Sequence, residues 1–224
     1  MNQTQGPACE AFAVQDCALA AIATGRRAYN LRELRDKLLD IDADSIYYHF
    51  WGGLLRPRFD DPEYHNDFAI WSQCALQDAV LAERLGIINP TDFQDINQLR
   101  EHVIEVIEER MDEREQVPGV GSESPFYFIR SQIVVFDTSS RITHPEELSQ
   151  KIPAMSVGSI FYHFIDALRR SEADQDDFSS WLQGCFDVEY TELCEALQSI
   201  DPFFSGLTEL RNRLTNIFLT HLGG

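Results

Sequence analysis

The sequence lacks the signatures of most familiar catalytic and nucleotide-binding sites. It contains no G-x-G-x-x-G pattern, P-loop, H-E-x-x-H, G-x-S-x-G or EF-hand loop. Gly119 and Gly121 lie in a segment without the strand and helix that must flank a phosphate-binding loop. The motifs therefore predict no particular reaction, no cofactor and no metal.

Long apolar runs and positive charges are also scarce. No stretch approaches the ~18 consecutive apolar residues of a membrane span, and the opening residues lack the basic start and apolar run of a secretory signal. The net charge of -19 repels phosphate backbones and anionic lipids. We therefore expect a soluble, cytoplasmic protein that binds neither nucleic acid nor membranes.

The five cysteines are odd in number and show no C-x-x-C spacing, which argues against a disulfide framework and a structural zinc site. The simpler expectation is that all of them are reduced, as in a cytosolic protein. They are Cys9, Cys17, Cys74, Cys185 and Cys194.

An internal repeat is the strongest positive feature of the chain. Residues 45–50 and 159–164 match at five of six positions, with an offset of 114 (159 minus 45). The same offset places Phe12 on Phe126 without a gap, and a four-residue deletion then aligns Trp71 with Trp181. Order, spacing and residue type agree over most of the repeat, which indicates a tandem duplication.

The alignment predicts two homologous units, at residues 12–111 and 126–222. The Pro, Gly, Ser and charged residues at 112–125 are typical of a linker. Two small units have difficulty burying their apolar stripes separately. We therefore expect the copies to pack about a pseudo-twofold axis, as a covalently joined homodimer would.

Each copy is expected to open with a strand, because β-branched and aromatic residues dominate 126–136. Residues 12–23 are rich in alanine, but homology favours a strand there too. Thr24-Gly25 and residues 138–140 are expected to form turns that end these strands.

Helices are expected to fill the rest of each copy, so the fold class is mainly α with a small β element, α+β. Capping residues predict where the helices begin, and the apolar spacing in 96–107 and 207–218 predicts one buried stripe on each last helix. The expected caps are Asn30 with Glu33, Pro145 with Glu147, Ser45 and Ser159, and Asp67 and Asp177.

The repeat also duplicates a set of candidate site residues. His and Asp together are able to form an acid–base pair or supply metal ligands, and arginines are able to hold an anion. Structural roles explain the same residues: a helix cap for each Asp, buried hydrogen bonds for each His, ion pairs for each Arg and a core position for each Trp. The catalytic candidates are His49, His163, Asp67 and Asp177, and the ligand-binding candidates are Arg56, Arg58, Arg170, Tyr48 and Tyr162.

The N-terminal copy has an insertion, at residues 56–65, that concentrates charged and aromatic side chains in a loop. Loops carry function more often than scaffolds do. If the protein has an asymmetric site, we expect it there, but a plain surface loop is the favoured interpretation of these residues.

The paired segments 45–50 and 66–71, and 159–164 and 176–181, resemble an uncharacterised bacterial and archaeal family of unknown function. The resemblance covers nearly the whole chain and implies no reaction, cofactor or catalytic residue. One departure is that Asp176 replaces Asn66, which argues against a strict role for Asn66.

These observations favour a binding, regulatory or accessory protein over an enzyme. The expected partner is another protein or a small anionic ligand, and the oligomeric state is open. Two alternatives remain: a metal-dependent or His/Asp acid–base hydrolase, and an anion or sugar-phosphate binder.

Overall fold

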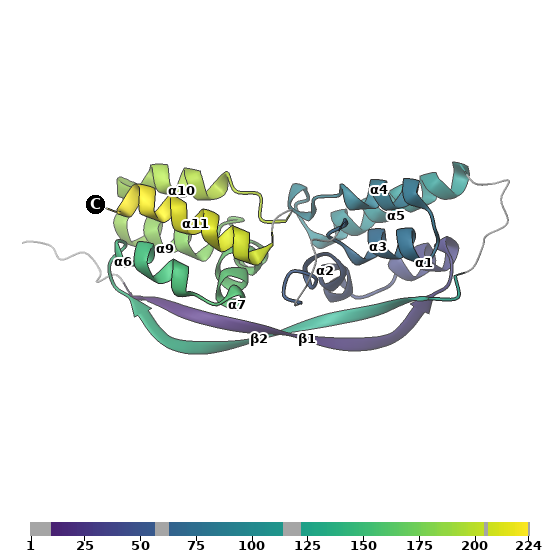
Figure 1. The fold of residues 1–224 in the computed structure, drawn as a ribbon, viewed down its shortest axis with the longest axis horizontal. Coiled ribbons are helices and arrows are strands. Elements are labelled where there is room, and N and C mark those ends of the chain that lie inside the picture. The colour runs from purple at the N-terminus through teal and green to yellow at the C-terminus, as the bar shows by residue number, and fades with distance from the viewer. Residues whose placement is uncertain (1–9, 57–62, 114–121, 204–205, 224) are drawn as a thin grey trace, which may run out of the picture. The chain divides into compact units, whose positions relative to one another are not determined.

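The fold consists of two groups of short helices and one pair of long strands (Figure 1). The computed structural model describes residues 10–56, 63–113, 122–203 and 206–223. Strand β1 (Phe12–Ala28) pairs with β2 (Phe126–Ile142) in a two-stranded antiparallel sheet. The predicted strands and the α+β class are confirmed, and both strands are longer than predicted.

The turns predicted inside these strands are wrong. Gly25 and Ser139 have φ of 75° and 62°, yet both strands continue past them. Thr24 Oγ1 accepts the N–H of Arg26, and Thr138 Oγ1 accepts that of Ser140. A left-handed residue inside a strand bends it locally, as in a β-bulge, without ending it. The sequence therefore indicates where the backbone departs from an extended conformation, but not that the strand continues past these residues.

The chain forms two compact units, each of which contains part of both strands. One holds Leu19–Ile133, and the other holds the described residues before Leu19 together with those from Val134 onward. We call them the α1–α5 unit and the α6–α11 unit. Each unit thus combines the helices of one half of the sequence with strand residues that open the other half. The boundaries predicted at 12–111 and 126–222 remain a prediction about the sequence copies.

In the α1–α5 unit, the helices lie on one side of their part of the strand pair (Figure 1). The final helix buries Leu99, Val103 and Ile107, as its spacing predicted. The helices are α1 (Leu31–Leu38), α2 (Ala43–Trp51), α3 (Asp67–Cys74), α4 (Ala79–Gly86) and α5 (Ile96–Glu113), with a 3-10 turn at Pro90–Asp92. The predicted linker at 112–125 falls largely on 114–121, which lie outside the described residues.

The α6–α11 unit has a similar order of helices. A π-helix at Phe161–Asp166 joins α7 to α8, so these three pieces run without a break from Val157 to Arg170. The last helix buries Leu210, Leu214 and Phe218, again as predicted. The remaining elements are α6 (Glu147–Lys151), α7 (Val157–Ile160), α8 (Ala167–Arg170), α9 (Asp177–Phe186), α10 (Thr191–Gln198) and α11 (Leu207–Leu222), with 3-10 turns at Ile152–Ala154 and Asp187–Tyr190.

The predicted caps of the first helices are partly confirmed. Asn30 accepts the N–H of Glu33, and the Glu33 carboxylate accepts the N–H of Tyr29, the residue before the cap, in a variant of the capping box. Glu147 accepts the corresponding N–H, that of Thr143, and also the N–H of His144, although α6 begins at Glu147 itself and not at Pro145.

The caps predicted for the next two helices are wrong. Ser45 lies inside α2, and Ser156, not Ser159, caps α7. Asp67 is the first residue of α3, and Asn66 caps that helix by accepting the N–H of Ala69. In α9 the same role belongs to Asp176, which accepts the N–H of Ser179 at 2.9 Å. Asn and Asp are both good N-caps, so the replacement of Asn66 by Asp176 preserves the role.

The expectation of five reduced cysteines is also wrong. Cys185 is disulfide-bonded, whereas Cys17, Cys74 and Cys194 are free thiols. An odd count and the absence of C-x-x-C exclude a regular framework but not a single bridge between distant positions. No helix of the described part is long and apolar enough to cross a membrane.

The difference between the caps Asn66 and Asp176 predicts how the stability of the protein depends on pH. Asp176 is 3% exposed, and burial raises the pKa of its carboxyl group. When the pKa of a carboxyl group is higher in the folded than in the unfolded protein, ionisation of that group destabilises the fold. The loss of stability grows as the pH rises from the unfolded pKa to the folded pKa. Asp176→Asn should therefore raise the melting temperature at pH 7, and its advantage should shrink as the pH falls toward about 4.

The matched control is Asn66→Asp. This change should lower the melting temperature at pH 7, because the Asn66 amide also donates to the Leu85 carbonyl at 2.9 Å. Thermal unfolding over a pH series measures both variants. An Asp176→Asn protein that is less stable than the parent at pH 7 would refute this interpretation of the cap.

Candidate functional site

His49 joins helix α2 to strand β2 in the α1–α5 unit. Its side chain is 2% exposed, and its Nδ1 lies 2.8 Å from Oδ2 of Asp67. Its Nε2 accepts the backbone N–H of Ile129 at 3.1 Å. Because Nε2 is an acceptor, a neutral ring carries its proton on Nδ1, and this N–H donates a hydrogen bond to the carboxylate. Ser45 donates to the carbonyl of Ile129 at 2.8 Å, so α2 satisfies both backbone groups of this strand residue.

His163 occupies the same position in the α6–α11 unit. Its side chain is 3% exposed, its Nδ1 lies 2.7 Å from Oδ2 of Asp177, and its Nε2 accepts the N–H of Gln15 at 2.8 Å. Gln15 belongs to β1. Each histidine thus holds a strand residue from the other sequence copy, and each is oriented by an aspartate of its own copy.

Burial and the neighbouring charges set the protonation of the first pair. Burial lowers the pKa of His49, and the Asp67 carboxylate opposes this effect only in part. Burial alone would raise the pKa of Asp67, but hydrogen bonds from His49 and Arg56 bring it below its ordinary value. A neutral imidazole beside an ionised carboxylate is the stable combination.

An arginine and a tyrosine complete the cluster of the α1–α5 unit. Arg56 donates from Nη2 to Asp67 at 3.1 Å, and its guanidinium lies 4.7 Å from the ring centre of Tyr48. The Arg56 side chain is 42% exposed. Arg58 lies outside the described residues, as do residues 57–62 of the predicted functional loop.

The matching arginine of the α6–α11 unit is held more firmly. Arg170 donates to Asp177 at 3.0 Å and lies 4.0 Å from the ring centre of Tyr162. It also donates to the carbonyl of Tyr162 and, through Nε, to Asp166 at 3.0 Å. The Asp166 side chain is 2% exposed. Gly52 stands at the corresponding place in the other copy (166 minus 114), so comparing the copies did not reveal Asp166.

Aromatic side chains hold the strand against the helices of the α1–α5 unit. The ring of Phe126 stacks on Phe68 at 5.0 Å and lies 4.6 Å from the ring of His49. The indole N–H of Trp71 donates to the carbonyl of Ser124 at 2.9 Å. Trp71 is buried, as predicted.

The α6–α11 unit repeats this arrangement on β1. Phe12 stacks on Phe178 at 5.2 Å and lies 4.8 Å from His163. Trp181 donates to the carbonyl of Glu10 at 2.9 Å. The sequence offset had already paired Phe12 with Phe126, but an offset does not show which helices a segment contacts. The strand partners of the two histidines were missed for this reason.

A buried thiol beside the cluster of the α6–α11 unit is also hydrogen-bonded. The thiol of Cys17 donates to the carbonyl of Gly158, and burial raises its pKa to about 12. Among the residues that the structure describes, no three His, Cys, Asp or Glu side chains are grouped to hold a metal ion. We call the His–Asp pair of each unit, together with the strand N–H that the His accepts, the clasp.

The chain belongs to the family described as "Family of unknown function (DUF5752)", which matches residues 9–219. A similar solved structure is that of OrfY from Thermoproteus tenax, with a TM-score of 0.81 and 24% identity over 98% of this chain and 99% of that chain. At this identity the likeness shows the fold. No curated protein matches the sequence.

The clasp makes a prediction about stability. His49→Gln and His163→Gln should each destabilise the fold by about 1–3 kcal/mol, the usual cost of leaving a buried hydrogen-bonding group unpaired. Glutamine has one donor and one acceptor, but its amide does not reproduce the positions of both ring nitrogens. Chemical denaturation measures the loss.

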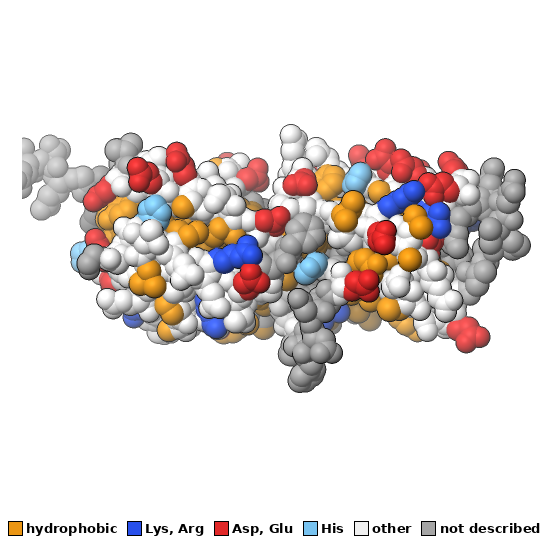
Figure 2. Space-filling model, turned by 45° about the horizontal axis from the view of Figure 1, so that its top comes forward, with side chains coloured by type: hydrophobic (Ala, Val, Ile, Leu, Met, Phe, Trp, Pro, Cys, Tyr) orange, Lys and Arg blue, Asp and Glu red, His pale blue; other side chains and the backbone are white. Residues whose placement is uncertain are grey.

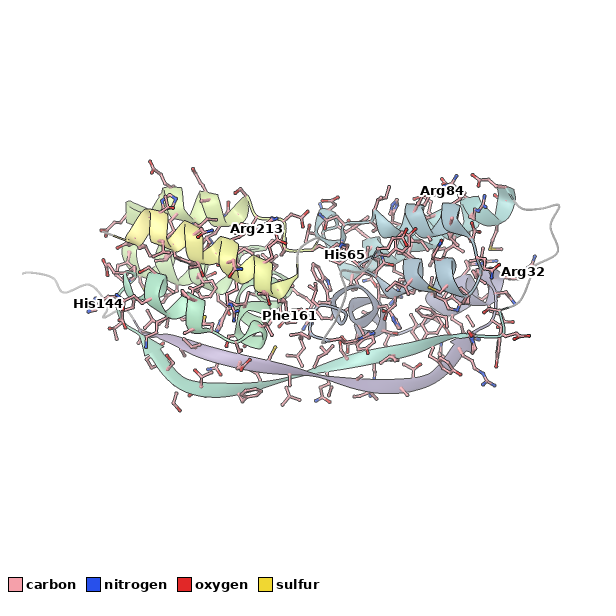
Figure 3. All side chains as sticks on the ribbon, viewed as in Figure 1. Arg32, His65, Arg84, His144, Phe161 and Arg213 are labelled. Atoms are coloured by element: carbon pink, nitrogen blue, oxygen red, sulfur yellow. The ribbon has the colours of Figure 1, made fainter. Side chains whose placement is uncertain are left out.

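His144→Gln is the control for these variants. His144 is exposed just before α6 (Figure 3), and its replacement should leave stability unchanged. If His49→Gln and His163→Gln are as stable as this control, the histidines do not hold the strands.

Proposed function

We propose that this chain is a binding or regulatory protein, acting as an accessory to another protein, and that it is not an enzyme. The observation that carries the proposal is the double engagement of His49 and His163, whose two ring nitrogens each have a partner. A tandem duplication, with the copies related by a pseudo-twofold, is part of the proposal. The matched contacts of the two clasps support it.

The rival proposal of a hydrolase requires a lone pair that these histidines do not offer. A general base takes a proton through an unprotonated ring nitrogen, and a metal ligand donates the same lone pair. In both units that lone pair, on Nε2, accepts a strand N–H. Asp67 and Asp177 each bind an imidazole and a guanidinium. A hydrolase would need to break the clasp before each reaction.

Exposed apolar residues on β2 support the binding part of the proposal. Val134, Val135 and Phe136 are 49%, 42% and 46% exposed, although they are consecutive. Neighbouring strand residues point to opposite faces, so both faces of the strand are open at this place. Open apolar surface on a strand is typical of a contact with another protein.

Charge favours a neutral or cationic partner. Acidic side chains gather on the helical side of the α1–α5 unit, at the right of Figure 2. The exposed residues of α5 include Glu101, Glu105, Glu108 and Glu109. This surface repels nucleic acid and other polyanions.

Arg56 supports the second candidate, the binding of a small anion or sugar phosphate. Among the described residues Arg56 has one carboxylate partner, Asp67, whereas Arg170 has two, Asp166 and Asp177. A half-exposed guanidinium is able to accept a further anion. Of the two matched arginines, Arg56 is therefore the better candidate for such a ligand.

Chemical modification separates the accessory protein from the hydrolase. Diethylpyrocarbonate attacks an accessible, unprotonated ring nitrogen, so the exposed His144 and His221 should react in the folded protein. His49 and His163 should stay unmodified until the protein unfolds, because their Nε2 atoms are buried and bonded. Peptide mass spectrometry, with circular dichroism to confirm the fold, measures this difference. Rapid modification of either clasp histidine in folded protein would favour the hydrolase.

A further inference from the structure

The two strand segments that the helices hold share one pattern of contacts. In each, a tryptophan N–H binds a backbone carbonyl, a phenylalanine two residues later stacks on the helices, and a histidine accepts the backbone N–H five residues after that carbonyl. The carbonyl, ring and N–H belong to Ser124, Phe126 and Ile129 in one unit, and to Glu10, Phe12 and Gln15 in the other. Each helix group is therefore a groove that binds an extended segment in a fixed register.

Recognition in these grooves relies on backbone groups and one ring. Two of the three contacts go to the main chain, which any extended segment offers, while the stacked Phe sets the register. This combination is typical of sites that bind a peptide as an added strand. In this chain the grooves are occupied by its own strands.

The segment in the α6–α11 groove is the one best placed to exchange. Residues 10–18, which we call the arm, belong to this unit, but the chain continues from Ala18 into the α1–α5 unit. The pairing of the arm with β2 stays inside the same unit, where Thr138 donates to the carbonyl of Val14. The contacts of the Glu10 carbonyl, Phe12, Val14 and Gln15 lie within this unit and can therefore form with an arm from another molecule.

The stretch that follows the arm is suited to act as a hinge. Ala20, Ala21 and Ala23 are exposed, and Gly25 has a φ of 75°. These small side chains bury little surface, so a change of direction here gives up strand pairing with β2 but few side-chain contacts. Short connecting segments of this kind are where exchange of identical elements between molecules takes place.

We propose that the arm is exchangeable, and that the α6–α11 groove accepts the same arm from a second copy of this chain to form an arm-exchanged dimer. A second copy is the partner because every copy carries the one segment already known to satisfy the groove. The contacts are the same in the monomer and the dimer. The balance between them therefore depends on the effective concentration of the arm attached to its own chain, and dimers increase with protein concentration.

Two variants of the full chain test the proposal by complementation. Phe12→Ala damages the arm and leaves the groove intact, whereas Phe178→Ala damages the groove and leaves the arm intact. Both rings are buried, at 7% and 0% exposure, so each variant alone should melt at a lower temperature than the parent. Refolding them together from denaturant should give a heterodimer that contains one intact arm–groove contact. The experiment is run in reducing agent, because Cys185 is disulfide-bonded.

Native mass spectrometry should detect the heterodimer at twice the 25.7 kDa of the chain, and its melting temperature should exceed that of either variant. Two differently labelled copies of Phe12→Ala provide the matched control, which should give no stabilised dimer. A mixture that stays monomeric and melts as the sum of its parts would overturn the proposal. A control pair that dimerises with equal stability would also overturn it, since the arm would not be responsible.

Discussion

The structure depends on one hydrogen bond made twice, between the imidazole of a buried histidine and the backbone N–H of a strand. A strand in a two-stranded sheet has one edge without a neighbouring strand, and an unpaired N–H is costly to bury. His49 and Ser45 bind both backbone groups of Ile129, so two side chains of α2 make the hydrogen bonds that a third strand would otherwise make. An aspartate fixes the tautomer that leaves the accepting nitrogen free of hydrogen.

This bond also explains why each unit needs both sequence copies. Phe126 lies against Phe68 and His49, and Phe12 against Phe178 and His163, so each helix group buries an aromatic ring that the other copy provides. A buried Phe is worth about 1.5–3 kcal/mol through apolar burial, a large share of the stability of a small unit. The helices of one copy alone would leave this site open to water. Each helix group is therefore completed by a strand segment from the other half of the sequence.

Much of the fold was predictable because it rests on local patterns. The apolar stripes of α5 and α11 follow the helical period, and β-branched residues identified β2. The predictions that failed concern single positions whose effect depends on distant neighbours. Gly25 and Ser139 bend the strands without ending them, and Ser45 bonds to a strand instead of capping a helix. The matched segments of the sequence pointed to two sets of His, Asp, Arg and Tyr, and the structure brings the members of each set together. The matched segments did not reveal Gln15 and Ile129, because an alignment of two copies does not show which copy pairs with which.

Direct detection of the clasp bond is the most decisive test. In uniformly ¹⁵N-labelled protein, a scalar coupling across the hydrogen bond should connect the amide nitrogen of Ile129 with Nε2 of His49, and that of Gln15 with Nε2 of His163. The ring proton should reside on Nδ1 in both histidines. Rings that carry their proton on Nε2, with no coupling to the strand amides, would contradict the account, because the imidazoles would then be donors with no part in holding the strands.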